Sequence, residues 1–272
     1  MKYPFFGKFM VKWRNPLSEE EMKEWESISI KSDSGALIKG LFAKSRREEQ
    51  KATIVLGHPM GKEAKGYFLK RGYTELLRDQ GYNVVVFDIN GFGESSMGNF
   101  SYFEDIVAIS IKAKELTPNL PIGYHGISLG AQYSVIAFTD DKHQYNFAIV
   151  ESAATTLKEF WVRFPVAYRA LLFISMFLPK YERKIEMIER MKEVKKIDSM
   201  LLIYSKGDTW VPFEMGERYQ KNAPLKAGLW EVEKAEHAAI MESSQKKEYQ
   251  AKIIEFFDLS VVEGKGYRKP EH

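Results

Sequence analysis

Cysteine is absent from this chain of 272 residues. Its absence excludes disulfides, thiolate metal sites and a cysteine nucleophile together. Long apolar runs are also lacking, because the longest, from Pro165 to Pro179, contains an arginine and is too short to span a bilayer. Residues 1–16 scatter lysine and arginine among aromatic residues and offer no apolar core for a signal peptide. These features predict a soluble, cytoplasmic protein.

An excess of charge of either sign is missing as well. The chain has 40 basic and 37 acidic side chains, for a net charge of +3, so nothing indicates a nucleic-acid partner. With 44% hydrophobic residues, the chain has enough apolar surface for a sizeable core. Its length suits one large α/β domain better than two small ones.

Short apolar runs punctuate the sequence and indicate strands. The first two alternate around Asp33, Ser34 and Gly35, which is typical of an antiparallel hairpin. The later runs are continuous, as in parallel strands that are covered on both faces. The predicted strands span 27–32, 36–44, 53–58, 83–89, 121–127, 147–153, 200–205 and 228–233.

Segments with helical spacing lie between these runs, for example 67–80 and 103–116. Alternation of strand and helix predicts a doubly wound, mostly parallel sheet with right-handed crossovers, preceded by the hairpin. In such sheets ligands bind beyond the carboxyl ends of the strands. The loops that follow the strands are therefore where functional residues are expected.

Residues 155–196 interrupt this rhythm with a long helical insertion. Apolar residues recur there at intervals of three and four, and Pro165 is expected to end or kink a first helix. We interpret the insertion as a lid over the carboxyl end of the sheet; an ordinary pair of packed crossover helices is the alternative. The predicted organisation is an N-terminal extension (1–26), a core (27–154 and 197–260), the lid and a frayed tail (261–272).

A serine between two glycines, in the sequence GISLG, follows the strand at 121–127 and precedes a predicted helix. A sharp strand-to-helix turn of this kind holds its serine in a strained conformation, and side chains at Gly126 and Gly130 would collide with neighbouring elements. Free N–H groups at the start of the helix would also face charge that develops beside Ser128. The pattern predicts a nucleophile at Ser128.

A serine nucleophile needs a base, and the chain has only five histidines. His143 falls in a polar loop expected at the surface, His272 ends the chain, and His125 lies within a predicted strand, where a structural role is expected. His58 follows another strand. His237 follows the last strand and comes after the serine and a carboxylate in sequence, which favours it as the base.

Two carboxylates compete as the partner of the histidine. Asp208 lies in the loop directly after the strand at 200–205, where a plain turn role beside Gly207 is the alternative. Glu151 comes directly after the apolar run FAIV of the predicted strand at 147–153 and is the other candidate acid. Asp208 is preferred because its surroundings, GDTWVP, match a known pattern.

That pattern belongs to the α/β-hydrolase superfamily, which the chain resembles from about Ser27 to Phe257. The resemblance rests on five motifs in order: LGHPMG, FDINGFGES, GISLG, GDTWVP and EHAAI. It implies that Ser128 is the nucleophile, His237 the general base and acid, and Asp208 its orienting partner. It also implies an oxyanion hole made by the backbone N–H groups of Met60 and Leu129.

Two positions depart from the family pattern. Pro59 stands where a glycine is usual and has no N–H to donate, which is why the first oxyanion donor falls on Met60. Asn90 stands where the family has arginine, which removes an ion pair. Asp88 and Glu94 in the same segment are interpreted as structural.

Other motifs fail on inspection. The segment GHPMGKE resembles a phosphate loop because Gly61 and Lys62 follow a strand. However, Leu56 stands where the first glycine of that loop belongs, and Glu63 replaces its serine or threonine. GFGESS lacks the third glycine of a dinucleotide fingerprint. No two histidines stand at metal-ligand spacing. The sequence therefore predicts neither a cofactor nor a metal.

The resulting hypothesis is a serine hydrolase of small-molecule esters or thioesters with an apolar acyl group. Trp161, Phe164, Tyr168 and Phe173 of the lid are predicted to line the acyl pocket. The alternatives are a serine aminopeptidase, with an acidic group for the substrate amine, or a non-catalytic binding protein. The N-terminal aromatics indicate either a segment packed on the domain or, less favoured, contact with a lipid surface. The sequence carries no sign of an oligomeric state. The acidic candidates for the aminopeptidase are Glu151, Glu159 and Glu182.

Overall fold

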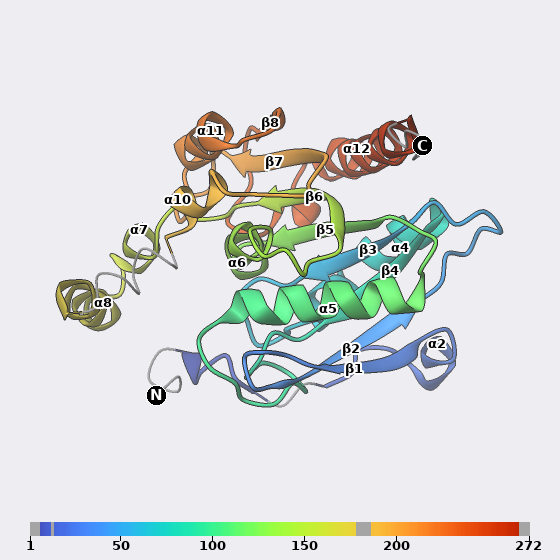
Figure 1. Ribbon diagram of the computed structural model, residues 1–272, viewed down its shortest axis with the longest axis horizontal. Coiled ribbons are helices and arrows are strands. Elements are labelled where there is room, and N and C mark those ends of the chain that lie inside the picture. The colour runs from blue at the N-terminus through green and yellow to red at the C-terminus, as the bar shows by residue number, and fades with distance from the viewer. Residues whose placement is uncertain (1–5, 12–13, 178–185, 267–272) are drawn as a thin grey trace.

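The computed structural model describes residues 6–11, 14–177 and 186–266. Its centre is one eight-stranded sheet with the strand order β1-β2-β4-β3-β5-β6-β7-β8 (Figure 1). β1 and β2 are antiparallel, β2 runs antiparallel to β4, and every other pairing is parallel. This confirms the predicted fold class. The strands are β1 (Glu26–Lys31), β2 (Leu37–Ala43), β3 (Ala52–Gly57), β4 (Tyr82–Phe87), β5 (Ile122–Ile127), β6 (Tyr145–Glu151), β7 (Ser199–Ser205) and β8 (Ala227–Val232).

Helices cover both faces of the sheet. The five central strands, β3 to β7, are buried along almost their whole length, which explains their continuous apolar runs. One hydrophobic core lies under α5, α6, α10 and α11, and the other under α3, α4 and α12. The helices are α2 (Glu19–Met22), α3 (Gly66–Lys70), α4 (Tyr73–Asp79), α5 (Tyr102–Leu116), α6 (Leu129–Ala137), α7 (Leu157–Trp161), α8 (Pro165–Phe177), α10 (Met187–Met191), α11 (Phe213–Asn222) and α12 (Lys246–Gly266), with a 3₁₀ turn at Ile240–Glu242.

Two glycines with positive φ shape the first half of the chain. Gly35 has a φ of 84° in the turn of the predicted β1–β2 hairpin, and its N–H donates to the carbonyl of Ser32. Gly72 has a φ of 77° and separates α3 from α4. The single helix predicted over 67–80 is therefore wrong, because a left-handed residue breaks it in two.

The inserted region holds α7, α8 and α10 among its described residues. α8 begins at Pro165, as the missing N–H of proline favours, and the three residues before it separate it from α7. Figure 1 shows α7 and α8 beyond the end of the sheet toward which the arrows of β5 and β7 point. α10 is the last of the three, and residues 178–185 lie outside the described part.

The C-terminal segment differs from the prediction. α12 continues to Gly266, and Val261 is buried against the second core. The helix therefore extends over the first six residues of the predicted tail, 261–266. Within the described ranges, no helix is both long and apolar enough to cross a membrane.

Candidate active site

Ser128 occupies the sharp turn between β5 and α6. Its φ is 51° and its ψ is −109°, a strained conformation for a residue with a side chain. A Cβ atom on Gly126 would lie 2.7 Å from the backbone nitrogen of Ala131, and one on Gly130 would lie 2.2 Å from the carbonyl oxygen of Gly57. The predicted collisions are confirmed, so glycine is required on both sides of the serine.

The structure brings Ser128, His237 and Asp208 together in one chain of hydrogen bonds. The Oγ of Ser128 lies 2.7 Å from Nε2 of His237, and Nδ1 of His237 lies 2.7 Å from Oδ2 of Asp208. The other carboxylate oxygen of Asp208 accepts the N–H groups of Trp210 and Val211 at 2.8 and 2.9 Å. Because one oxygen is held by the loop, the second is aimed at the imidazole.

The loop that carries His237 is fastened from two sides. The hydroxyl of Tyr67, on α3, donates to the carbonyl of Ala238 at 2.7 Å, and Ala238 has a positive φ of 54°. The Trp210 ring stacks on the imidazole of His237, with the centroids 6.2 Å apart and an angle of 26° between the planes. The imidazole therefore rests against a flat apolar surface while its nitrogens face Ser128 and Asp208.

Met60 and Leu129, the predicted oxyanion donors, both lie at the cavity beside Ser128. Leu129 is the first residue of α6, where a backbone N–H has no acceptor within the helix. The N–H of Gly130 donates to the carbonyl of His58 at 3.1 Å, which ties the loop after β3 to the serine turn. This arrangement suits a site for negative charge at the start of the helix.

The loop after β3 is supported from below by His58. Its Nε2 accepts the N–H of Ile89 at 3.0 Å, so its Nδ1 carries the proton that bonds the carbonyl of Pro59 at 2.8 Å. Complete burial lowers the pKa of His58 against the smaller raising effect of Asp88. His58 is therefore a neutral structural group.

A buried lysine supplies the positive charge that the sequence lacks at Asn90. The Nζ of Lys65 lies 2.5 Å from Asp88 and 2.7 Å from Glu94, and the side chains of Lys65 and Asp88 are fully buried. Asn90 donates instead to Asp105, at 2.6 Å. The structural interpretation of Asp88 and Glu94 agrees with these contacts. Sequence reasoning missed Lys65, since its partner lies 23 residues away.

A second histidine–carboxylate pair lies inside the molecule. Nε2 of His125 is 3.0 Å from Oε2 of Glu151, and neither side chain is exposed. The hydroxyl of Tyr249 also donates to Glu151. His125 thus has the structural environment that was expected, and the partner of Glu151 is His125 rather than His237.

His143 is not at the surface, contrary to the prediction. It is 1% exposed, its Nδ1 accepts the N–H of Tyr145, and its Nε2 donates to the carbonyl of Lys195. Burial lowers its pKa. The polar sequence around it misled the prediction, because the hydrogen bonds that satisfy a buried imidazole here come mostly from the backbone.

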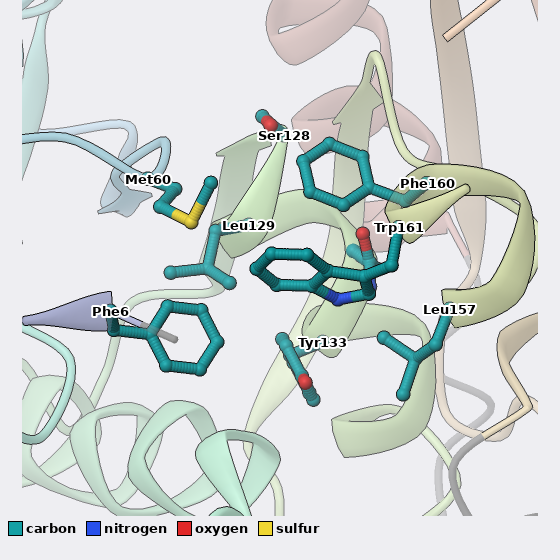
Figure 2. A pocket seen from close by; sticks show the side chains of 9 residues that line it. Phe6, Met60, Ser128, Leu129, Tyr133, Leu157, Phe160 and Trp161 are labelled. Carbon is teal, nitrogen blue, oxygen red and sulfur yellow. The ribbon is translucent and has the colours of Figure 1, made fainter. Parts of the chain in front are cut away.

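The cavity at Ser128 has a mostly apolar lining (Figure 2). Trp161 lines it as predicted, and the periodic apolar face of the insertion also supplies Leu157 and Phe160. Sequence reasoning missed the other three side chains that close it, Phe6 of the N-terminal segment and Gln132 and Tyr133 of α6. The full lining is Phe6, Met60, Ser128, Leu129, Gln132, Tyr133, Leu157, Phe160 and Trp161.

The other three predicted pocket residues do not line this cavity. Phe164 packs behind it, with its ring centroid 5.3 Å from that of Trp161 and 5.8 Å from that of Trp210. Tyr168 and Phe173 lie on α8. Phe173 is 63% exposed and contacts Phe177.

The described residues do not gather three or more histidine, aspartate or glutamate side chains in a group suited to hold a metal ion. The site presents a hydroxyl, an imidazole, a carboxylate and backbone N–H groups.

A family model described as serine aminopeptidase, S33, matches residues 48–200, more than half of the chain. The matched segment includes the loop after β3, the serine turn and the inserted region. None of the curated proteins matches the chain.

Solved structures of hydrolases resemble the whole fold. An esterase of Pyrococcus furiosus superposes with a TM-score of 0.71 at 19% identity, covering 91% of this chain and 98% of that one. An esterase of Exiguobacterium antarcticum gives 0.61 at 14% identity, covering 86% and 100%. The Pyrococcus horikoshii acylaminoacyl peptidase gives 0.64 at 18% identity, covering 88% of this chain and 42% of the peptidase. At these identities the likeness shows the fold.

Proposed function

Because this chain belongs to the serine aminopeptidase S33 family of α/β-hydrolases, we propose that it is a serine hydrolase that cleaves carboxylic esters or thioesters through an acyl-enzyme. The observation that carries the proposal is the hydrogen-bonded chain from Asp208 through His237 to Ser128, which ends at an apolar cavity. Each of the three side chains has the neighbour that the chemistry requires of it.

In the first step Ser128 is the nucleophile. Nε2 of His237 is 2.7 Å from Oγ and takes its proton as Oγ bonds to the substrate carbonyl carbon. The positive imidazole that forms is stabilised by Asp208, whose carboxylate keeps Nδ1 protonated and the ring in place. The carbonyl oxygen becomes an oxyanion in this step.

The backbone N–H groups of Met60 and Leu129 are the proposed oxyanion donors, each worth about 3 kcal/mol in the transition state. When the intermediate collapses, His237 gives its proton to the departing alcohol or thiol. His237 then takes a proton from water, the hydroxyl attacks the acyl carbon, and Ser128 recovers its proton as the carboxylic acid leaves.

The apolar lining favours an ester or thioester over a peptide with a free amine. An aminopeptidase needs an acidic group beside the scissile bond, and none of the residues that line the cavity is acidic. Glu151 is bound to His125 and Tyr249, and Glu159 is paired with Arg218 at 2.8 Å. Glu182 lies outside the described residues. The family description keeps the aminopeptidase as the second candidate.

Packing of the N-terminal segment on the domain is favoured over contact with lipid. Phe6 is 5% exposed, and Phe9 and Met10 pack against the same hydrophobic core. Aromatic side chains that are engaged in this way are not free to enter a lipid surface.

Covalent labelling with a fluorophosphonate tests the proposal. The native chain is expected to be labelled, and the Ser128→Ala and His237→Ala variants are expected to lose the label. Ser134→Ala is the matched control, because Ser134 is a buried serine on the same helix whose hydroxyl bonds Ala131 instead of a histidine. Equal labelling of native and Ser128→Ala chains would overturn the mechanism, and an unlabelled but folded native chain would favour a binding protein.

A further inference from the structure

The cavity beside Ser128 is small. The nine side chains that line it leave room between them for about one water-sized group. A methyl group needs about as much space as a water molecule, whereas a long acyl chain needs far more. The walls of this cavity therefore decide how large a substituent the proposed acyl-enzyme accepts.

We propose that Phe6 and Trp161 form the end wall of the acyl pocket and restrict the substrate to short acyl groups, such as acetyl and propionyl. The inference rests on the proposed function, because it assigns the substrate class of the same site. It gives the N-terminal segment, which lies outside the matched family region, a role in specificity.

Phe6 and Trp161 are the first and the last residue of the lining along the chain, and their rings are in contact. Their ring centroids are 5.6 Å apart and their planes are at 78°, an edge-to-face contact. Figure 2 shows both rings on the same side of Ser128, with Leu129 beside Phe6. The Phe6 ring has no polar atom, so this part of the wall offers an acyl chain no hydrogen bond, only a limit to its length.

Phe6 is held firmly from behind. Its ring packs edge-on against Tyr102 at 5.8 Å and Phe92 at 6.2 Å, and both of these residues are completely buried. Withdrawing Phe6 to admit a longer chain would break these contacts and expose apolar surface to water. Phe6 is therefore a fixed wall rather than a freely opening gate.

Trp161 is held in a similar way from the inserted region. It is 8% exposed, and its ring lies 5.3 Å from Phe160 and 5.3 Å from Phe164. Phe164 in turn contacts Trp210, which stacks on His237. The same aromatic cluster thus bounds the pocket and supports the proposed base.

The test is hydrolysis of p-nitrophenyl esters from acetate to dodecanoate by the full chain. The native chain is expected to prefer acetate over octanoate by about a hundredfold in kcat/KM. Phe6→Ala and Trp161→Ala are each expected to reduce that preference by about tenfold or more, through faster cleavage of the long esters. Phe6→Leu, a milder change, covers the case in which Phe6→Ala fails to fold.

Phe100→Ala is the matched control. The ring centroid of Phe100 lies 6.4 Å from that of Phe6, but Phe100 does not line the cavity. Its truncation should therefore leave the preference for acetate over octanoate unchanged. A native chain that cleaves octanoate as fast as acetate would overturn the inference, as would an unchanged preference in folded Phe6→Leu and Trp161→Ala variants.

Acetate esters of alcohols of increasing length distinguish the acyl side from the alcohol side. If the Phe6 variants change only the alcohol preference, the cavity holds the alcohol and the inference is wrong. Fluorophosphonate labelling of Ser128 in the native chain tests the proposed function separately. A chain that is labelled at Ser128 but indifferent to acyl length refutes the pocket alone.

Discussion

The molecule contains two histidine–carboxylate pairs with opposite surroundings. Asp208 and His237 are joined at 2.7 Å in loops beyond the sheet, and the His237 side chain is 18% exposed and reaches Ser128. Glu151 and His125 are joined at 3.0 Å at the end of two adjacent strands, and both are fully buried. A histidine–carboxylate pair alone therefore does not identify a candidate catalytic site, whereas contact with a serine hydroxyl and with solvent distinguishes one pair from the other.

The largest predicted effect separates the two carboxylates by activity. Asp208→Asn removes the acceptor that keeps Nδ1 of His237 protonated, so kcat for p-nitrophenyl acetate should fall by about 10⁴-fold. Glu151→Gln is the matched control. It should leave kcat within about threefold, because the carboxylate of Glu151 bonds His125 and Tyr249 rather than Ser128, His237 or Asp208. Similar losses in both variants would abolish the distinction between the pairs.

The next largest effect is on stability, and here the buried pair, not the pair at Ser128, is expected to respond. Glu151→Ala leaves His125 and Tyr249 buried without their partner, and should lower the free energy of unfolding by about 3–5 kcal/mol in urea titrations. Glu193→Ala is the control, because its pair with Arg190 is partly exposed and should cost less than about 1 kcal/mol. Equal costs for both variants would mean that the buried pair is no more structural than a surface one.

A smaller effect is expected from the support of the His237 loop. Tyr67→Phe removes the hydrogen bond to Ala238 and should reduce kcat about fivefold, the value of about one hydrogen bond. Tyr145→Phe loses a comparable buried bond, to Ile106, far along the chain from His237. It should lower stability to a similar extent and leave kcat intact; a fall in kcat there too would point to a general loss of packing.

The smallest effect concerns a buried histidine with no carboxylate partner at hydrogen-bond distance. Burial lowers the pKa of His58 below its ordinary value of 6.5, so the folded chain holds it neutral. Below about pH 6.5 the unfolded chain binds a proton that the folded chain does not, so the free energy of unfolding falls as the pH falls. His58→Gln should make this fall shallower in urea titrations between pH 7 and 5. An unchanged slope would contradict the assignment.

The sequence predicted the parts of the site that depend on short-range order. The glycines around Ser128 are needed because backbone atoms lie within 3 Å of where their side chains would be, and that demand is visible in five residues of sequence. The order of strands and loops also singled out Asp208 and His237, which the structure brings to Ser128. Their catalytic roles stay a proposal.

Contacts between segments that are distant along the chain could not be predicted from the sequence. Phe6 meets Trp161 across 155 residues, and Lys65 meets Asp88 only because β3 and β4 are neighbours in the sheet. Neither pairing has a periodicity to reveal it. An apolar stripe likewise does not tell which side of a helix finds a partner, and Phe173 on α8 is 63% exposed.

Trapping the acyl-enzyme is the most direct test of the proposed mechanism at Ser128. The native chain is mixed with p-nitrophenyl acetate, quenched in acid within one turnover and digested, and its peptides are weighed by mass spectrometry. One acetyl group is expected, on the peptide that contains Ser128, accompanied by a burst of p-nitrophenol equal to the enzyme concentration. An acetyl group on another residue, or the same modification in Ser128→Ala, would contradict it.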